Sequence, residues 1–124
     1  MIPDRCFGSL LLVLIGMFSN VIVVIADWRK NGVGGILRME NGSVVGSFQE
    51  ASGPGPPILL ELMAIKKGLI FFASIQRRFE DRLIVESDSK VAVDWIKNFD
   101  RCPNVYVDLV YEIITKLRGL GGII

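Results

Sequence analysis

The chain has 124 residues, of which 51% are hydrophobic and 22% charged, and this is enough for one domain with a single core and excludes a disordered or polar tail. The 14 Lys and Arg residues against 13 Asp and Glu residues leave a net charge of +1, so any nucleic-acid binding must come from local patches. No histidine is present and the two cysteines, Cys6 and Cys102, lie far apart, which excludes imidazole catalysis and the usual zinc sites and makes a disulfide scaffold improbable.

The N-terminal segment carries no charge from Cys6 to Ala26 and has two interpretations. It is long enough to span a bilayer or to act as a secretory signal, with Arg29 and Lys30 on the cytoplasmic side of an anchor. Its second half, Val21–Ile25, is β-branched throughout, which is typical of a strand buried on both faces. We therefore divide the chain into residues 1–26, a first strand or a membrane or signal segment, and a domain of residues 27–124.

A hairpin and a helix follow. Asn41 and Gly42 form the strongest two-residue hairpin signal, between strands predicted over Gly35–Met39 and Ser43–Phe48. Three prolines and two glycines in Ser52–Pro57 then mark a surface loop that leads into a helix predicted over Ile58–Ser74. Apolar residues at helical spacing predict the buried face of this helix: Leu62, Ile65, Leu69 and Phe72.

The last elements are a strand and two helices. Leu83–Val85 is a predicted strand, Ser89 is placed to cap a helix that runs to about Asn98, and a final helix covers about Tyr106–Leu117. A hairpin before a strand–helix–strand–helix succession predicts a mixed sheet with flanking helices, an α/β fold. The predicted inward residues of the two helices are Ala92, Trp95, Ile96, Val110, Ile113, Ile114 and Leu117.

Two carboxylates stand where such a fold places ligands. Glu61 is expected in the first turn of its helix, either compensating the helix dipole or pointing along the edge of the core. Asp88 is expected at the carboxyl end of a strand, either capping the next helix or binding a ligand. Taken together, two carboxylates without His or Cys are the hard oxygen ligands that Mg²⁺ or Mn²⁺ prefers.

Three stretches in order carry a family resemblance: GVGGILRMENGSVVGSF, LLELMAIKKGL and LIVESDSKVAVDWI. They resemble the G-x-G-G-V-L-R hairpin, the A-E-L-x-A-I helix and the V-E-S-D-S strand end of the ribonuclease H-like domain of plant retroelements and of the reverse-transcriptase-like proteins derived from them. The resemblance covers about Asn31 to Leu117. It implies a ribonuclease H-like mixed five-stranded sheet and hydrolysis, with two Mg²⁺ or Mn²⁺ ions, of the RNA strand in an RNA–DNA hybrid.

The resemblance also implies roles for single residues. Glu61 matches the carboxylate of the family's helix, and Asp88 matches the carboxylate at its strand end. Glu86 is then expected next to the site without being a ligand, and Ser87 and Ser89 are expected to hold the ligand residues in position. Recognition of the hybrid is expected to follow the shape of its backbone and its 2′-hydroxyls.

The chain departs from the family pattern at both ends. The family's first carboxylate belongs to an aspartate–glycine motif, and counting back from Gly34 places that position at Val21. Either a shortened loop allows Asp27 to serve as the first catalytic and metal-binding carboxylate, or unrelated sequence replaces the first strand. After Gly119 the chain reaches only the expected beginning of a fifth strand, so the final strand and helix, with the family's last carboxylate, are predicted to be incomplete.

These departures leave three hypotheses open. The first is an RNA–DNA hybrid ribonuclease that binds Mg²⁺ with Asp27, Glu61 and Asp88, in the nucleus or cytoplasm. The second is an inactive nucleic-acid-binding remnant, and the third is a domain carried by a membrane anchor in residues 6–26. Phosphate contacts, or merely a solvated helix surface, are expected from Lys66, Lys67, Arg77 and Arg78.

Overall fold

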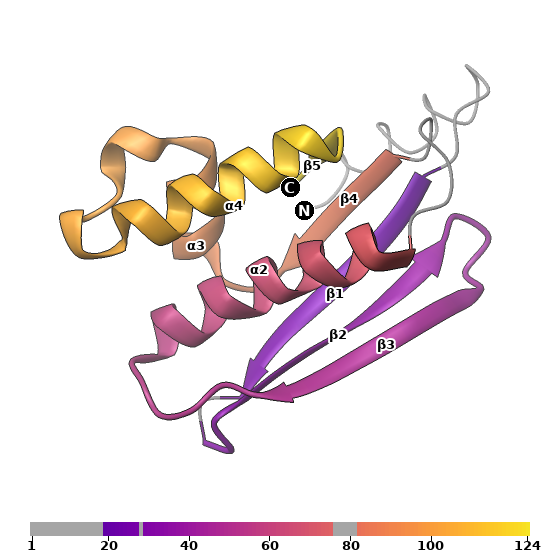
Figure 1. Ribbon diagram of the computed structural model, residues 1–124, viewed down its shortest axis with the longest axis horizontal. Coiled ribbons are helices and arrows are strands. Elements are labelled where there is room, and N and C mark those ends of the chain that lie inside the picture. The colour runs from indigo at the N-terminus through magenta and orange to yellow at the C-terminus, as the bar shows by residue number, and fades with distance from the viewer. Residues whose placement is uncertain (1–18, 28, 76–81) are drawn as a thin grey trace.

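The computed structural model of the protein describes residues 19–27, 29–75 and 82–124, which form a mixed sheet with helices along one face (Figure 1). The strands are β1 (Ser19–Asp27), β2 (Gly32–Met39), β3 (Val44–Ala51), β4 (Arg82–Ser87) and β5 (Gly122–Ile123). The helices are α2 (Pro57–Ile75), α3 (Lys90–Lys97) and α4 (Val107–Gly119), and two short 3₁₀ helices, η1 (Phe99–Arg101) and η2 (Asn104–Tyr106), join the last two.

The sheet has five strands in the order β3-β2-β1-β4-β5. β1 lies at its centre, antiparallel to β2 and parallel to β4, while β5 pairs in parallel with the far side of β4. A parallel pair needs a crossover connection, and α2 supplies part of the connection that leads from β3 to β4. The predicted α/β class, a mixed sheet with flanking helices, is therefore confirmed.

The second half of the N-terminal apolar segment forms strand β1. Val21–Ile25 lies within this strand, with Val21–Val24 paired on both sides, so the interpretation of these residues as a strand is confirmed, whereas the expected burial on both faces is not found because Ile25 is exposed. The boundary predicted between residues 26 and 27 falls inside β1, and residues 1–18 of the apolar segment lie outside the described residues. Among the helices of the described residues, none has both the length and the apolar character needed to cross a membrane.

The predicted hairpin forms between β2 and β3. Its turn is closed by the N–H of Gly42, which donates to the carbonyl of Met39, and by the N–H of Ser43, which donates to the Asn41 side chain. Gly42 has a φ of 91°, a conformation that glycine adopts without strain. Both strands extend beyond the predicted ranges, because pairing in the sheet continues from Gly32 to Ala51.

α2 packs across β1 and β2 at a point of close approach. A Cβ on Gly68 of α2 would lie 2.7 Å from Cγ1 of Val24 and 3.3 Å from Cδ1 of Ile22, so only glycine allows this contact. The apolar stripes predicted for α2 and α4 are buried in one core cluster with the sheet. Of the residues predicted to face inward from α3, Ala92 and Ile96 are buried and Trp95 is only partly covered.

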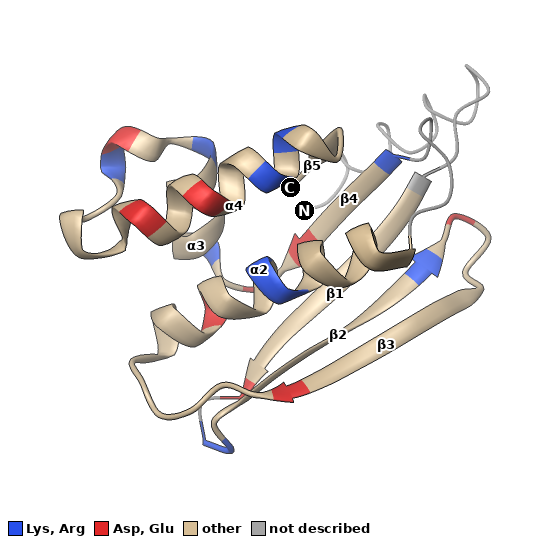
Figure 2. Ribbon diagram, viewed as in Figure 1, with Lys and Arg blue, Asp and Glu red and all other residues tan. Residues whose placement is uncertain are grey.

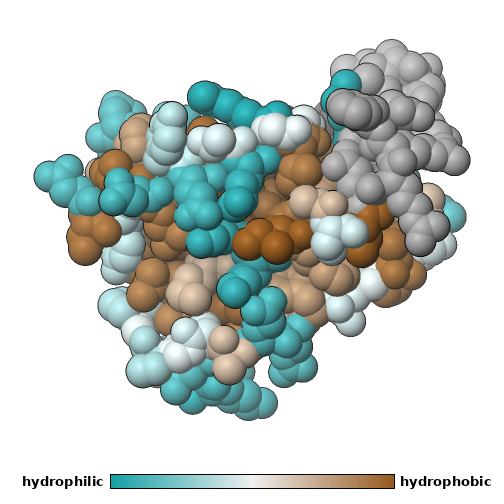
Figure 3. Space-filling view, viewed as in Figure 1, coloured by the Kyte–Doolittle hydropathy of each residue, from teal (hydrophilic) through white to brown (hydrophobic). Residues whose placement is uncertain are grey.

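Helices cover one face of the sheet, and within the described residues the other face has no helix over it (Figure 1). Ile22 and Val24 of β1 face α2, and because side chains alternate along a strand, Ile25 and Asp27 face the other side. Within the described residues no helix covers that side, and Ile25 is 56% exposed there. On the helix side, apolar side chains reach the surface between hydrophilic ones (Figure 3).

Candidate carboxylate site

Glu61 reaches the site from the second turn of α2. The helix begins at Pro57, whose fixed φ suits a first helical residue, and the carbonyl of Pro56 accepts hydrogen bonds from the N–H groups of Leu59 and Leu60. The first turn of α2 contains no acidic residue, so the expectation that Glu61 lies there is wrong. Compensation of the helix dipole is consequently a poor explanation for Glu61, because that effect is confined to the first turn.

Asp88 follows β4 directly and is held between two serines. The Ser89 side chain accepts a hydrogen bond of 3.2 Å from the N–H of Ala92, which confirms Ser89 as the cap of α3. The Ser87 hydroxyl accepts a hydrogen bond of 3.1 Å from the N–H of Ser89. Since the capping role belongs to Ser89, the exposed Asp88 carboxylate is available for another contact.

That contact is with Glu61. Acidic residues stand near the start of α2 and at the carboxyl end of β4 (Figure 2). Burial, then the negative charge of Asp88 and a side-chain hydrogen bond to it, raise the pKa of Glu61 from its ordinary value of 4.5 to about 7. Two ionised carboxylates cannot hydrogen-bond each other, so protonated Glu61 donates to the Asp88 carboxylate. Glu61 therefore carries a proton below a pH of about 7, and a cation could replace that proton.

The pair lies in a shallow groove of about 500 Å³ between α2 and α3. Trp95, which was predicted to face inward, packs against the edge of the core and also lines the wall of this groove, its ring stacked on Tyr106 at a centroid distance of 5.6 Å. The available signal was the spacing of Val91 and Trp95, which puts both on one side of the helix that starts just after Asp88. The groove is lined by Pro57, Ile58, Glu61, Asp88, Ser89, Val91 and Trp95.

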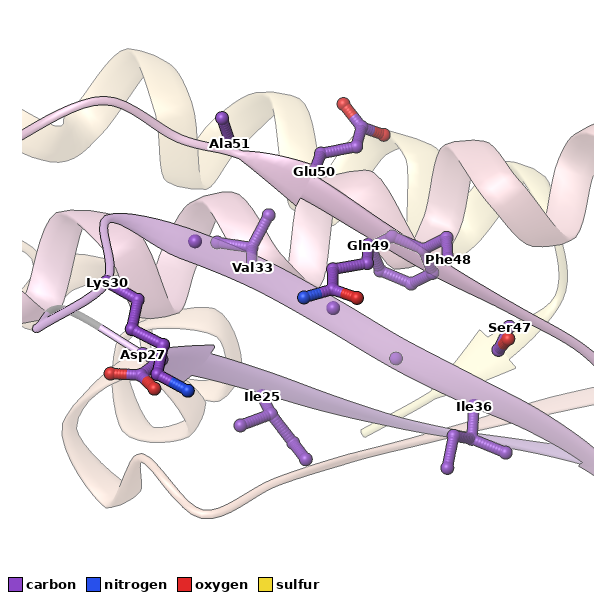
Figure 4. Close-up of a pocket in the computed structure, with 13 residues that line it drawn as sticks. Ile25, Asp27, Lys30, Val33, Ile36, Ser47, Phe48, Gln49, Glu50 and Ala51 are labelled. Carbon is purple, nitrogen blue, oxygen red and sulfur yellow. The ribbon is translucent and has the colours of Figure 1, made fainter.

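Asp27 is not brought to this pair. Its carboxylate accepts a hydrogen bond of 3.2 Å from the N–H of Arg29, within the turn that links β1 to β2. Figure 4 shows it beside Lys30, with Ile25 and Ile36 pointing to one side of the sheet and Glu50 to the other. It lines a separate hollow along β1, β2 and β3. In residues 19–27, 29–75 and 82–124, no three Asp, Glu or Cys side chains gather closely enough to hold a metal ion.

Glu86 belongs to the other side of β4. It is paired with Val23 of β1, whereas Ser87 is paired with Val24, which faces α2. Because neighbouring positions in register point the same way, the Glu86 side chain points away from the helix face, and Ser87 points toward it. Glu86 is thus close to Asp88 in the sequence, but its side chain faces away from the groove.

The lysines predicted to contact phosphate have partners inside the protein. Lys66 lies 3.2 Å from a carboxylate oxygen of Glu112 on α4, and Lys67 lies 3.0 Å from one of Glu50 on β3. They flank α2 on opposite sides, and a solvated helix surface with ion pairs describes them well. The other two residues of the predicted patch, Arg77 and Arg78, lie outside the described residues.

The donor set fits one divalent cation. Mg²⁺ is commonly bound by one or two carboxylates together with water and a substrate phosphate, and Glu61 and Asp88 offer two carboxylates in contact in an open groove. The set does not fit the two-ion site implied by the resemblance, since the described residues add no third carboxylate to the pair. Sequence reasoning thus identified the two residues that meet, while Asp27 lies elsewhere.

Comparison with solved structures gives the fold, although no curated protein matches the chain by sequence. The N-terminal RNase H domain of a Mycobacterium tuberculosis protein, fused to maltose-binding protein, is 17% identical, with 86% of this chain and 78% of that chain covered at a TM-score of 0.73. RNase H1 from Halobacterium salinarum is 16% identical, with 88% and 84% covered and a TM-score of 0.62. LC11-RNase H1, isolated from compost and solved with an RNA/DNA hybrid, is 14% identical, with 85% and 81% covered and a TM-score of 0.69.

The sequence itself matches one family model, described as reverse transcriptase-like, over residues 21–118. The match begins within β1 and ends within α4, so it contains the central strand, both carboxylates of the pair and the helix that closes the core. Together with the strand order and the solved structures of similar fold, it confirms the part of the resemblance that concerns a reverse-transcriptase-like, ribonuclease H-like domain. The chain belongs to the reverse transcriptase-like family, and its domain has the ribonuclease H fold.

Proposed function

We propose that this domain binds RNA–DNA hybrids and holds one divalent cation, Mg²⁺ or Mn²⁺, between Glu61 and Asp88. The observation that carries the proposal is the contact of these two carboxylates in an open groove at the carboxyl end of β4. The ribonuclease H fold, and the RNA/DNA hybrid in one similar structure, support the choice of nucleic acid.

The groove needs a cation before it can accept a phosphate. Two carboxylates repel a phosphate group, and a divalent ion between them supplies the positive charge that a phosphate oxygen can bind. Ser87 and Ser89 hold the backbone on either side of Asp88, which fixes the direction of its carboxylate. The same backbone and cation contacts can be made to any sequence, so recognition should follow the A-like shape of the hybrid and its 2′-hydroxyls.

A binding assay tests this proposal directly. The fluorescence anisotropy of a labelled RNA–DNA hybrid is measured against protein concentration at low salt, in millimolar Mg²⁺ and in EDTA. We expect Mg²⁺ to strengthen binding, and both Glu61→Gln and Asp88→Asn to remove that gain. Asp100→Asn, a change at an exposed carboxylate on η1, serves as the matched control and should keep it. Hybrid affinity that is absent in the folded wild-type protein, or that is identical in Mg²⁺ and EDTA, would contradict the proposal.

A second candidate function is hydrolysis of the RNA strand, the activity implied by the family resemblance. The observation in its favour is that the helix carboxylate and the strand-end carboxylate meet at one site. Incubation with a hybrid labelled on its RNA strand, in Mg²⁺ or Mn²⁺, should then give cleavage that Asp88→Asn abolishes. If the folded protein binds the hybrid and leaves the RNA intact, the domain is a binding module without ribonuclease activity.

A further inference from the structure

The groove beside the carboxylate pair has an apolar wall that the cation site does not use. Val91 and Trp95, one turn apart on α3, line it opposite Pro57 and Ile58 of α2. Trp95 is partly covered, and Tyr106 stacks against it with an angle of 26° between the ring planes, which limits the rotation of the indole. An immobilised aromatic side chain in a groove is a contact surface with little conformational entropy left to lose on binding.

Two lysines of α3 have no carboxylate partner in the part of the chain that the structure describes. Lys90 and Lys97 are exposed on its outer side, and neither forms an ion pair within the described residues. Asp94, which lies between them on the helix, is engaged by Arg101 at 3.2 Å and by the Asn98 side chain at 2.9 Å. This leaves two cations of α3 unpaired, with the exposed Asp100 of η1 as the remaining carboxylate of the segment. Lys66 and Lys67 of α2, by contrast, each form an ion pair with a glutamate.

We propose that Trp95 is the surface against which one nucleotide of the bound hybrid packs, next to the phosphate held at the cation. This inference rests on the proposed function and names the part of the groove that packs against the sugar of a nucleotide. A nucleotide of a hybrid presents an anionic phosphate beside the apolar carbon atoms of its sugar. The groove combines the carboxylate pair with an aromatic wall, and Lys90 stands in the chain between Ser89 and Val91, which both line the groove. Tyr106 covers one face of the indole and the core packs against another part of it, so the nucleotide contacts the part of the ring that lines the groove.

The test compares hybrid affinities in Mg²⁺ for three variants. The bases of a hybrid are stacked on one another, so the ring packs on the sugar edge of a nucleotide, and Trp95→Ala should weaken binding by about threefold or more, the scale of a single aromatic contact. Trp95→Phe keeps an aromatic face and should retain most of the affinity. Tyr111→Ala removes an exposed aromatic ring that belongs to a separate pair with Phe99, and it should leave affinity unchanged. Urea unfolding of each variant checks whether the variant is folded.

Two further measurements report on the contact itself. The chain has two tryptophans, so a Trp28→Phe variant leaves Trp95 as the single indole, and its fluorescence should be quenched when hybrid is added. The slope of log affinity against log salt should become shallower in a Lys90→Ala, Lys97→Ala double variant, because each phosphate contact contributes close to one unit to the slope. The matched variant Lys66→Ala, Lys67→Ala should keep the wild-type slope.

The outcomes separate this inference from the function on which it rests. If the wild-type protein binds the hybrid, yet Trp95→Ala binds equally well and the indole fluorescence does not change, the role of Trp95 is overturned and hybrid binding stands. If Trp95→Ala and Trp95→Phe weaken binding equally although both are folded, the aromatic packing explanation is overturned. A folded wild-type protein that binds no hybrid overturns both proposals.

Discussion

Truncation of Ile22 to alanine tests whether the apolar segment before Asp27 is a structural part of the domain. Its side chain is fully buried in β1 between β2 and β4, and its Cδ1 lies 3.3 Å from where a Cβ on Gly68 of α2 would stand. Large-to-small changes at such positions cost about 2–5 kcal/mol, depending on how far the site can collapse. Paired strands on both sides and a helix above hold the backbone in place, so we expect about 3 kcal/mol.

Urea unfolding followed by circular dichroism measures this loss. With a typical dependence of about 2 kcal/mol per molar urea, a loss of about 3 kcal/mol lowers the midpoint by about 1.5 M. Ile25→Ala is the matched control, since it truncates the same residue type on the same strand at a position that is 56% exposed, where about 0.5 kcal/mol or less is expected. If the alanine variant does not fold, Ile22→Val takes its place in the measurement, with an expected loss of about 1 kcal/mol. Equal midpoints for Ile22→Ala and Ile25→Ala would refute the assignment of β1 to the core.

Three other predictions concern the site and its support. Folded protein keeps Glu61 protonated up to a pKa of about 7, whereas the unfolded chain ionises near 4.5, so stability without a divalent cation should fall as pH rises between these values. Glu61→Gln should flatten this decline in urea midpoints measured at pH 5 and pH 8, and an unchanged decline would exclude Glu61 as its source. Gly68→Ala should cost about 1–3 kcal/mol in urea unfolding because its Cβ would meet Val24 at 2.7 Å, while Gly119→Ala, with open space around it, should cost far less; equal losses would contradict the close approach. Ser89→Ala should remove the cap of α3 at a cost of about 1 kcal/mol in thermal unfolding, and Ser89→Thr should keep most of it; a neutral Ser89→Ala would mean that the cap contributes nothing.

The candidate site was predictable from sequence only where local pattern was enough. Glu61 and Asp88 were identified because one stands on a helix with a clear apolar stripe and the other at the end of a clear strand, and the structure joins them. Asp27 also follows a strand, yet its position along β1 puts it on the face opposite α2, and that depends on the pairing of β1 with its neighbours. The wall formed by Trp95 was missed because helical spacing puts Trp95 and Val91 on one side of α3 but does not show whether another element covers that side.

Sequence alone determined the helices, the Asn41–Gly42 hairpin and the order of the family motifs, because helical periodicity, turn chemistry and strand composition are local properties of the chain. Tertiary structure decided the rest. Val21–Ile25 became part of the central strand only because β4, which lies far away in the sequence, pairs on the side opposite β2, and a run of β-branched residues does not specify such a partner. For Lys66 and Lys67 the sequence left phosphate contacts and a solvated helix surface open, and the ion pairs with Glu112 of α4 and Glu50 of β3 favour the second. Charge pairing and strand register depend on which distant segments meet, so folding, and not local pattern, decides which carboxylates and cations can act together.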